Sequence, residues 1–205
     1  MAWCYYDIKY PDLHYPFRDV DGSGWYMFSV PVKKLVEIYK AHYHKMPNSF
    51  FDCGAAVGEL IRQAEELGLS ARGVDIKRYP TNFPSLRKYE KYFQSGQIQI
   101  KSILDCEPVM ADIAYCNGTL TYMTQQTLPL ALQKFQRVGM LIAIHNTTED
   151  ITTARKMGEE LLHDEPRLIR SNNWWLDTFK QNGLDACLDK KSGIFCAIPK
   201  KSKVR

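Results

Sequence analysis

Apolar and polar positions follow one another in blocks that predict a regular succession of strands and helices. Short, largely apolar runs, typical of strands in a buried sheet, lie at 49–53, 71–76, 97–103, 111–116, 138–144, 184–189 and 194–198. Segments with an apolar residue at every third or fourth position, typical of helices that bury one face, lie at 31–43, 58–67, 85–93, 127–137, 149–162 and 173–183. The chain is therefore expected to belong to the α/β class.

Local signals mark several boundaries of these elements. Pro31 suits the first turn of the first helix, and Gly68 is placed to close the second. Thr127 is the expected N-cap of the helix that follows it. Lys190-Lys191-Ser192-Gly193 separates the last two strands and is expected to form the turn of a hairpin.

The order of the elements predicts a doubly wound sheet. Strands and helices alternate as far as the last helix, which favours parallel strands joined by crossover helices. The terminal hairpin adds one antiparallel strand at or near an edge. We therefore expect a mostly parallel seven-stranded sheet with a C-terminal antiparallel hairpin. Ligands of such sheets bind at the carboxyl ends of the strands.

Aromatic residues are concentrated at the start of the chain. Nine of the twenty-five lie within the first 28 residues: Trp3, Tyr5, Tyr6, Tyr10, Tyr15, Phe17, Trp25, Tyr26 and Phe28. We expect an aromatic-rich N-terminal arm or lid at 1–30 and a single domain at 31–205. Such an arm packs on the domain in the simpler interpretation; in the other, it stacks a nucleobase or cages a cationic amine.

Length and composition restrict the class of protein. The chain has 205 residues, 45% of them hydrophobic and 24% charged, which is enough for a core that needs neither disulfides nor a metal. The cysteines form no C-x-x-C pair and are expected to be buried small side chains: Cys4, Cys53, Cys106, Cys116, Cys187 and Cys196. The sequence shows neither a signal peptide nor an apolar run that could span a membrane. We expect a cytoplasmic protein with no membrane partner.

The net charge of +4, from 27 basic and 23 acidic residues, neither requires nor excludes a nucleic-acid partner. Basic residues gather at 77–91 and 200–205. A solvated helix face and a frayed tail are the simpler interpretation of these clusters, and a phosphate-binding patch is the other.

The stretch FFDCGAAVGEL at 50–60 combines an apolar strand, a turn of small residues and the start of a helix. Small residues let a ligand approach the backbone, and the first N–H groups of the helix favour an anionic group there. Asp75, at the end of the next strand, lies where an acidic side chain accepts ribose hydroxyls in doubly wound folds. The spacing does not match G-x-G-x-x-G, because Ala56 and Glu59 stand in two glycine positions, and this disfavours a nicotinamide cofactor.

Asp52, Gly54, Ala56 and Gly58 resemble the first motif of the class I S-adenosylmethionine (SAM)-dependent methyltransferases, an acidic residue followed by G-x-G-x-G, with alanine at the middle glycine. The resemblance extends over about 31–199. It implies a Rossmann-like methyltransferase fold with SAM as the cofactor. The loop of Gly54, Ala56 and Gly58 would hold the methionine part of SAM, with Asp52 close by.

The same resemblance assigns the rest of the cofactor site. It places the ribose hydroxyls on Asp75 and the adenine against Ile76. After the third strand, the family usually has an acidic residue against the adenine amino group; here that stretch begins with Ser102 and Ile103, and Asp105 follows. Asn117 is expected to border the transferable methyl group, as a cofactor contact and as a catalytic candidate.

His145 is the second catalytic candidate. It directly follows the strand at 138–144, where an active-site base could sit, and histidine titrates near neutrality. A structural loop histidine is the alternative. Asp112 is expected to be a polar residue at the start of a strand, without a catalytic role. The other histidines lack the spacing of metal ligands, so no metal site is expected.

These observations lead us to expect methyl transfer by in-line displacement, in which the protein aligns the reactants and excludes water and a general base is optional. The acceptor is expected to be a small molecule or a peptide. The sequence leaves two alternatives. One is a nucleic-acid (RNA) methyltransferase, which has neither the N-P-P-Y signature nor the ribose 2′-hydroxyl catalytic set to support it. The other is a catalytically inactive SAM-binding module, supported by Ala56 alone.

Overall fold

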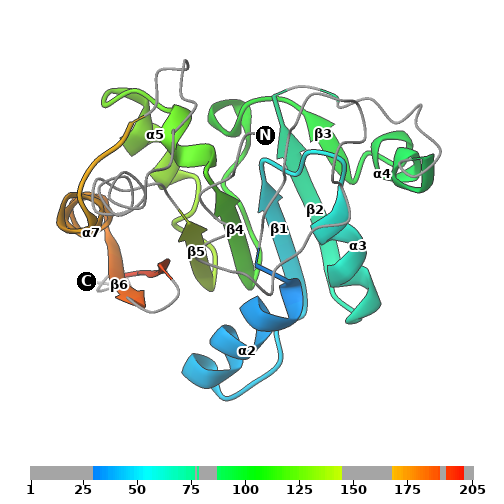
Figure 1. Ribbon diagram of the computed structural model, residues 1–205, viewed down its shortest axis with the longest axis horizontal. Helices are drawn as coiled ribbons and strands as arrows, with labels where there is room; N and C mark the ends of the chain where they lie inside the picture. Colours follow the sequence, from blue (N-terminus) through cyan, green and yellow to red (C-terminus); the bar gives the residue numbers. More distant parts are fainter. Residues whose placement is uncertain (1–29, 77, 79–86, 145–167, 190–192, 201–205) are drawn as a thin grey trace, which may run out of the picture.

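The computed structural model describes residues 30–76, 78, 87–144, 168–189 and 193–200 (Figure 1). In chain order its α-helices and strands are α2 (Val32–Tyr43), β1 (Ser49–Cys53), α3 (Glu59–Glu66), β2 (Ser70–Asp75), α4 (Glu90–Gln94), β3 (Ile98–Ile100), β4 (Ile113–Asn117), α5 (Thr127–Gln133), β5 (Met140–Ile144), α7 (Asn172–Gln181), β6 (Leu184–Asp189) and β7 (Ile194–Pro199). Three short 3-10 helices complete the described elements: η1 (Arg87–Tyr89), η2 (Ile103–Asp105) and η3 (Thr119–Tyr122).

The strands form one seven-stranded sheet in the order β3-β2-β1-β4-β5-β7-β6. The neighbours from β3 to β5 pair in parallel, whereas β7 pairs antiparallel with both β5 and β6. This confirms the expected fold class, including the terminal hairpin. The strand order reverses between β1 and β4, so the carboxyl ends of these two strands form the topological switch point of the sheet.

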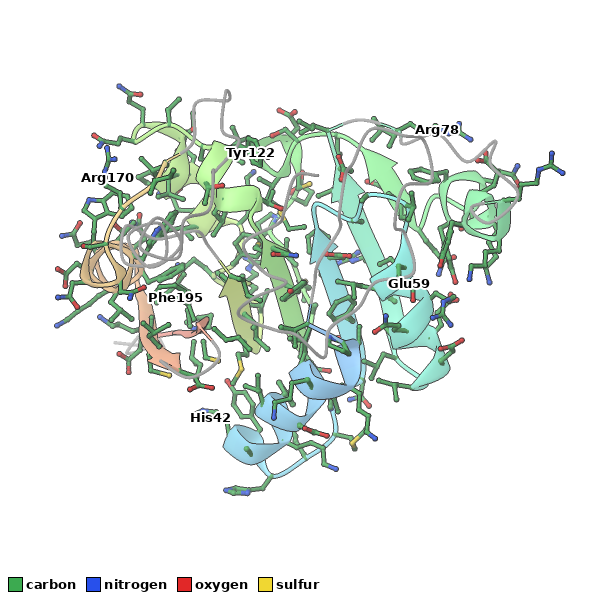
Figure 2. All side chains as sticks on the ribbon, in the orientation of Figure 1. His42, Glu59, Arg78, Tyr122, Arg170 and Phe195 are labelled. Atoms are coloured by element: carbon green, nitrogen blue, oxygen red, sulfur yellow. The ribbon has the colours of Figure 1, made fainter. Side chains whose placement is uncertain are left out.

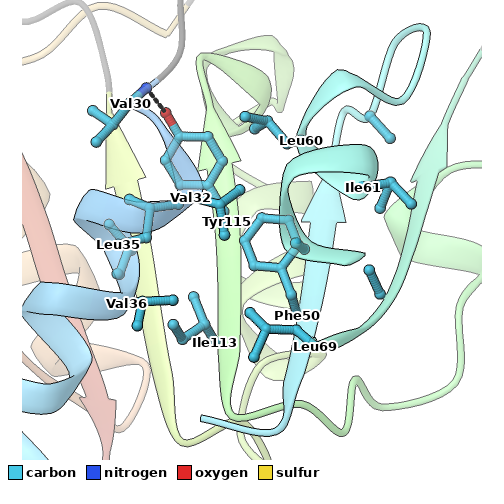
Figure 3. Close-up of a cluster of buried hydrophobic side chains, with 14 of the residues drawn as sticks. Val30, Val32, Leu35, Val36, Phe50, Leu60, Ile61, Leu69, Ile113 and Tyr115 are labelled. Carbon is cyan, nitrogen blue, oxygen red and sulfur yellow. Dashed lines mark hydrogen bonds between the residues drawn. The ribbon is translucent and has the colours of Figure 1, made fainter. Parts of the chain in front are cut away.

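Alternate side chains of the strands bury into two cores, one on each face of the sheet. One core combines α2 and α3 with residues such as Phe50 and Tyr115, which point toward the helices in Figure 3. The other core combines α5 and α7 with residues such as Phe51 and Phe195. The Val30 N–H donates to the Tyr115 hydroxyl (3.1 Å), which fixes the start of α2 over β4 (Figure 3).

Two expected elements are four residues shorter in the structure. The strand expected at 97–103 is only β3, because the Ser102 hydroxyl accepts the Leu104 N–H (3.2 Å) and starts η2. The helix expected at 127–137 ends at Gln133. Its N-cap is Gln126 and not Thr127, whose hydroxyl accepts the N–H of Thr124 instead (2.9 Å).

Several expectations fall on residues outside the described ranges. These are residues 1–29 of the arm expected at 1–30, the helix at 149–162 and the first part of the helix at 85–93, of which η1 and α4 are described. The division into an arm and a domain stays a prediction. Within the described part of the chain, no helix combines the length and the apolar character needed to cross a membrane.

The expected burial of the cysteines is confirmed for Cys53, Cys106 and Cys116 but is wrong for Cys187, which is exposed. Cys187 lies on β6, the last strand of the sheet, where every second side chain faces away from the α5 and α7 core.

Candidate functional site

The glycine loop leaves the carboxyl end of β1 and crosses to α3 through three residues in the left-handed region. Their φ angles are 92° at Gly54, 47° at Ala56 and 95° at Gly58. Ala56, at the middle position, therefore adopts a left-handed conformation, which costs glycine less free energy than any other residue. The backbone of the loop keeps the shape expected for the glycine motif. The N–H groups of Gly54 and Ala55 both donate to the Val74 carbonyl (2.8 and 3.0 Å), which holds the loop over the end of β2.

Two features require glycine at position 54: the positive φ of its backbone and the close approach of a neighbouring side chain. The Thr119 hydroxyl donates to the Cys53 carbonyl (2.6 Å) and fills the space beside Gly54. A Cβ atom at position 54 would lie 2.2 Å from the Thr119 Oγ1. The first glycine of the motif thus joins the loop after β1 to η3, which follows β4.

We expect Gly54→Ala to lower the free energy of unfolding by about 2–3 kcal/mol, the sum of about 1–2 kcal/mol for a left-handed alanine and about 1 kcal/mol for the displaced Thr119 hydrogen bond. Urea unfolding measures the change. Gly68→Ala is the matched control, because Gly68 also has a positive φ (78°) but a Cβ there would meet nothing within 4 Å. Equal losses in the two variants would contradict the packing role of Thr119.

Asp75 ties the loop to the end of β2. Its carboxylate is buried, and the Oδ2 accepts the N–H of Ala56 (2.8 Å). Ile76, the next residue, is 74% exposed at the end of the strand. An acceptor beside an exposed apolar side chain could receive the sugar and the base of a nucleoside, and the two roles implied by the sequence stay predictions.

Asp52 is the second buried carboxylate at this edge of the sheet. It is 2% exposed and lies in register with Gly73 of β2 and Tyr115 of β4. Within the described ranges, no hydrogen-bond donor reaches its side chain. Burial raises the pKa of Asp52 to about 8, and the negative charge of Asp75 adds to this rise. A cationic ligand would stabilise the ionised form of Asp52.

Asn117 ends β4, two residues beyond Tyr115, which is in register with Asp52. The alternation of side chains places Asn117 on the same face of the sheet as Tyr115, and therefore as Asp52 and Asp75. The following residue, Gly118, turns the chain into η3 with a φ of 69°, and its N–H donates to the Ile144 carbonyl (2.9 Å). The structure thus brings three predicted polar residues together on adjacent strands.

The other predicted residues are placed differently. The Ser102 hydroxyl caps η2, and the side chain of Ile103 is buried in the core on the opposite face of the sheet. Their contacts with adenine stay predictions, as does the general-base role of His145, which lies outside the described ranges.

Asp112 has the structural role that the sequence indicated. Its carboxylate accepts the N–H of Asn48 (2.7 Å), both the N–H and the hydroxyl of Ser49 (3.2 and 3.3 Å) and the Tyr39 hydroxyl (3.2 Å). These contacts lie at the amino end of β4, on the edge of the sheet opposite to Asn117.

Glu59 is a site residue that the sequence analysis did not single out. It follows Gly58 as the first residue of α3, is 5% exposed, and accepts hydrogen bonds from Arg62 (2.6 and 2.9 Å), Gln63 (3.1 Å) and Tyr89. Burial alone would raise the pKa of Glu59, but these hydrogen bonds and the charge of Arg62 lower it. The network fixes the start of α3, where Figure 2 labels Glu59. The only signal for it in the sequence is the E-x-x-R spacing.

A shallow cavity of about 100 Å³ lies elsewhere, against the other face of the sheet. It is lined by residues of β1, β2, β3 and the segment before β4, among them Phe51, Arg72 and Lys101. It contains none of the three polar residues described above, so we do not assign it to the site. Among the described residues, no group of histidine, cysteine, aspartate or glutamate side chains is arranged to hold a metal ion.

Comparisons with known proteins support the fold. No family model and no curated protein matches the chain. Among solved structures, the small RNA methyltransferase HEN1 is similar at a TM-score of 0.58 and 15% identity, over 89% of this chain and 28% of that one. The 1,6-didemethyltoxoflavin-N1-methyltransferase of Burkholderia thailandensis, solved with S-adenosylhomocysteine (SAH), is similar at 0.57 and 12%, over 82% and 78% of the two chains.

Magnesium protoporphyrin IX methyltransferase from Synechocystis PCC 6803, also solved with SAH, is similar at a TM-score of 0.55 and 15% identity, over 90% of this chain and 93% of that one. These identities are too low to carry a function across. They show that the chain has the Rossmann-like fold of the class I methyltransferases, which confirms the resemblance seen in the sequence at the level of the fold.

Proposed function

We propose that the protein is a SAM-dependent methyltransferase whose cofactor binds at the carboxyl ends of β1, β2 and β4. The observation that carries the proposal is the hydrogen bond from the Ala56 N–H to the Asp75 carboxylate (2.8 Å). It joins the glycine loop to the acidic residue of β2. The methionine and ribose parts of one molecule would thus contact two groups that are already held together.

The residues present fit such a cofactor. Ile76 offers an exposed apolar side chain for adenine, Asp75 an acceptor for the ribose, and Asp52 a buried carboxylate that lacks a donor among the described residues. When bound, SAM supplies a methyl group activated by a positive sulfonium. A positive sulfonium would favour the ionised form of Asp52, and by the same linkage the carboxylates of Asp52 and Asp75 would favour the cofactor over its neutral-sulfur product, SAH.

The chain's own contribution to the reaction would be alignment. Asn117 ends β4 at the switch point, on the same face of the sheet as Asp52, where its amide can orient the cofactor or the acceptor. Tyr122, at the end of η3, is 46% exposed and lies on the side of the molecule opposite to His42 of α2 (Figure 2). We place the acceptor between these two residues, where water must be excluded as the methyl group is transferred.

We favour a small-molecule or peptide acceptor over a nucleic acid. Two described members of the basic cluster at 77–91 have carboxylate partners: Arg78 pairs with Glu90, and Lys91 lies 3.9 Å from Glu65. Such pairs reduce the positive potential that phosphate binding requires. Two of the similar structures, by their names, methylate small molecules, and HEN1 methylates small RNA.

Calorimetric titration with SAM, with SAH and with NAD as a control tests the cofactor assignment. We expect saturable binding of SAM and SAH and none of NAD. Absence of SAM binding by the folded protein would reject the proposal and leave the glycine loop as a tight turn. Binding without methyl transfer to any acceptor would instead favour the inactive binding module.

A further inference from the structure

The terminal hairpin carries two cysteines directly opposite each other. Cys187 on β6 is in register with Cys196 on β7, and the two strands are antiparallel. Opposed residues of an antiparallel pair have Cα atoms about 4.5–5.5 Å apart, within the range of about 4.4–6.8 Å that a disulfide spans. Opposed residues also share a face of the sheet, so both thiols project to the same side.

The pair is accessible and is reduced in the structure. Cys187 is exposed and Cys196 is half-buried, and neither is in a disulfide. Cys53 and Cys116 form a contrasting pair, because they are also in register, on β1 and β4, but both are buried inside the sheet. An oxidant in solution would reach the hairpin pair and not the buried one.

Two aspartates flank Cys187 on its strand. Asp185 and Asp189 lie two residues on either side of Cys187, on the same exposed face of β6. Burial raises the pKa of Cys196 to about 12, with contributions from Cys187 and Asp189. Cys187 is therefore the thiol that reacts first, and a positively charged reagent approaches it more readily than a negatively charged one.

We propose that Cys187 and Cys196 form a redox-sensitive pair that closes to a cross-strand disulfide on reaction with a cationic low-molecular-weight disulfide. The Cys187 thiolate attacks one sulfur of the reagent, forms a mixed disulfide and releases one thiolate. The Cys196 sulfur, after losing its proton, then attacks the Cys187 sulfur and releases the second thiolate. Two protein thiols and one disulfide thus give one protein disulfide and two small thiols, which take up the two protons.

The disulfide would link β6, the edge strand of the sheet, covalently to β7. β6 pairs only with β7 among the described strands, and β7 connects it to β5. Closing the disulfide would restrict opening of this edge. The proposal does not depend on the methyltransferase assignment.

Treatment with cystamine, which is cationic, and with oxidised glutathione, which is anionic, tests the proposal in a Cys4→Ser background. Mass spectrometry is expected to show loss of two hydrogen atoms, peptide mapping a 187–196 link, and hydrogen exchange slower amides in β6. Cys196→Ser should stop at a mixed disulfide on Cys187. We expect cystamine to react at least several-fold faster than oxidised glutathione at equal concentration, and Asp185→Asn to reduce that ratio.

Three results would overturn the inference. The first is a stable mixed disulfide at Cys187 while Cys196 remains open to alkylation, which would mean that the two sulfurs do not meet. The second is equal rates with the two reagents, which would remove the selectivity for a cationic disulfide. The third is oxidation of Cys53 and Cys116 before the hairpin pair, because that order contradicts the burial of these side chains.

Discussion

Asp75→Ala is expected to weaken SAM binding by about 100-fold while the protein stays folded. The substitution removes the acceptor for the Ala56 N–H and the acceptor proposed for the ribose. If both ribose hydroxyls donate to this carboxylate, two hydrogen bonds to a charged group, at about 1.5 kcal/mol each, correspond to about 3 kcal/mol, or about two powers of ten in affinity. The measurement is calorimetric titration with SAM at constant pH, after the fold has been checked by circular dichroism.

Two control variants separate binding from stability. Asp75→Asn keeps an oxygen for the Ala56 N–H and loses only the second acceptor, so it is expected to bind with intermediate affinity. Asp112→Asn disturbs an acidic side chain with several hydrogen bonds at the opposite edge of the sheet, and should reduce stability while leaving the affinity for SAM unchanged. If Asp75→Ala bound SAM as tightly as the wild type, the ribose assignment would be wrong.

The fold could be predicted from the sequence because its elements have strong and separate signals. β1 and β6 have the bounds that their apolar runs indicated, and α2 and α3 agree with their apolar stripes within two residues. The order of strands and helices was enough to predict the doubly wound sheet, because a parallel strand pair requires a crossover connection. The predictions were less accurate where a local side chain competes with the backbone, as Ser102 does after β3.

The candidate site was predictable only in part, for a related reason. Residues of the loop and of the strand ends, such as Asp52 and Asp75, follow from their places in the sequence. The residues that hold these side chains and the loop in place cannot be identified from their places in the sequence. Thr119 packs on Gly54 from 65 positions away, and Tyr89 reaches Glu59 from 30 positions away. No periodicity within a single element encodes such contacts.

The supporting residues also explain why the loop keeps its shape with alanine in place of a glycine. Asp75 accepts the Ala56 N–H from one side, Thr119 packs against Gly54, and the Glu59 network fixes α3 directly after Gly58. A residue in the left-handed region persists where its surroundings determine its conformation. Ala56 alone is therefore weak support for an inactive module.

Asp52→Asn is expected to stabilise the free protein, and increasingly so as the pH rises. The pKa of Asp52 is raised from its ordinary value of 3.8 to about 8 in the folded state. Between these two pH values the Asp52 side chain is ionised in the unfolded chain and protonated in the folded protein. Ionisation therefore favours unfolding more strongly as the pH rises. This effect levels off above about pH 8. The advantage of the variant should grow by on the order of 4 kcal/mol from about pH 4 to about pH 7.

Urea unfolding of the two proteins across this pH range measures the effect, with Asp185→Asn, a substitution at an exposed aspartate of β6, as the control that should change little. An advantage that stays constant with pH would mean that Asp52 is ionised in the folded protein and has a partner there. The same substitution should weaken the binding of SAM more than that of SAH, because only SAM carries the sulfonium charge. A variant that is more stable but binds SAM less tightly would show that the buried carboxylate serves ligand binding and lowers the stability of the fold.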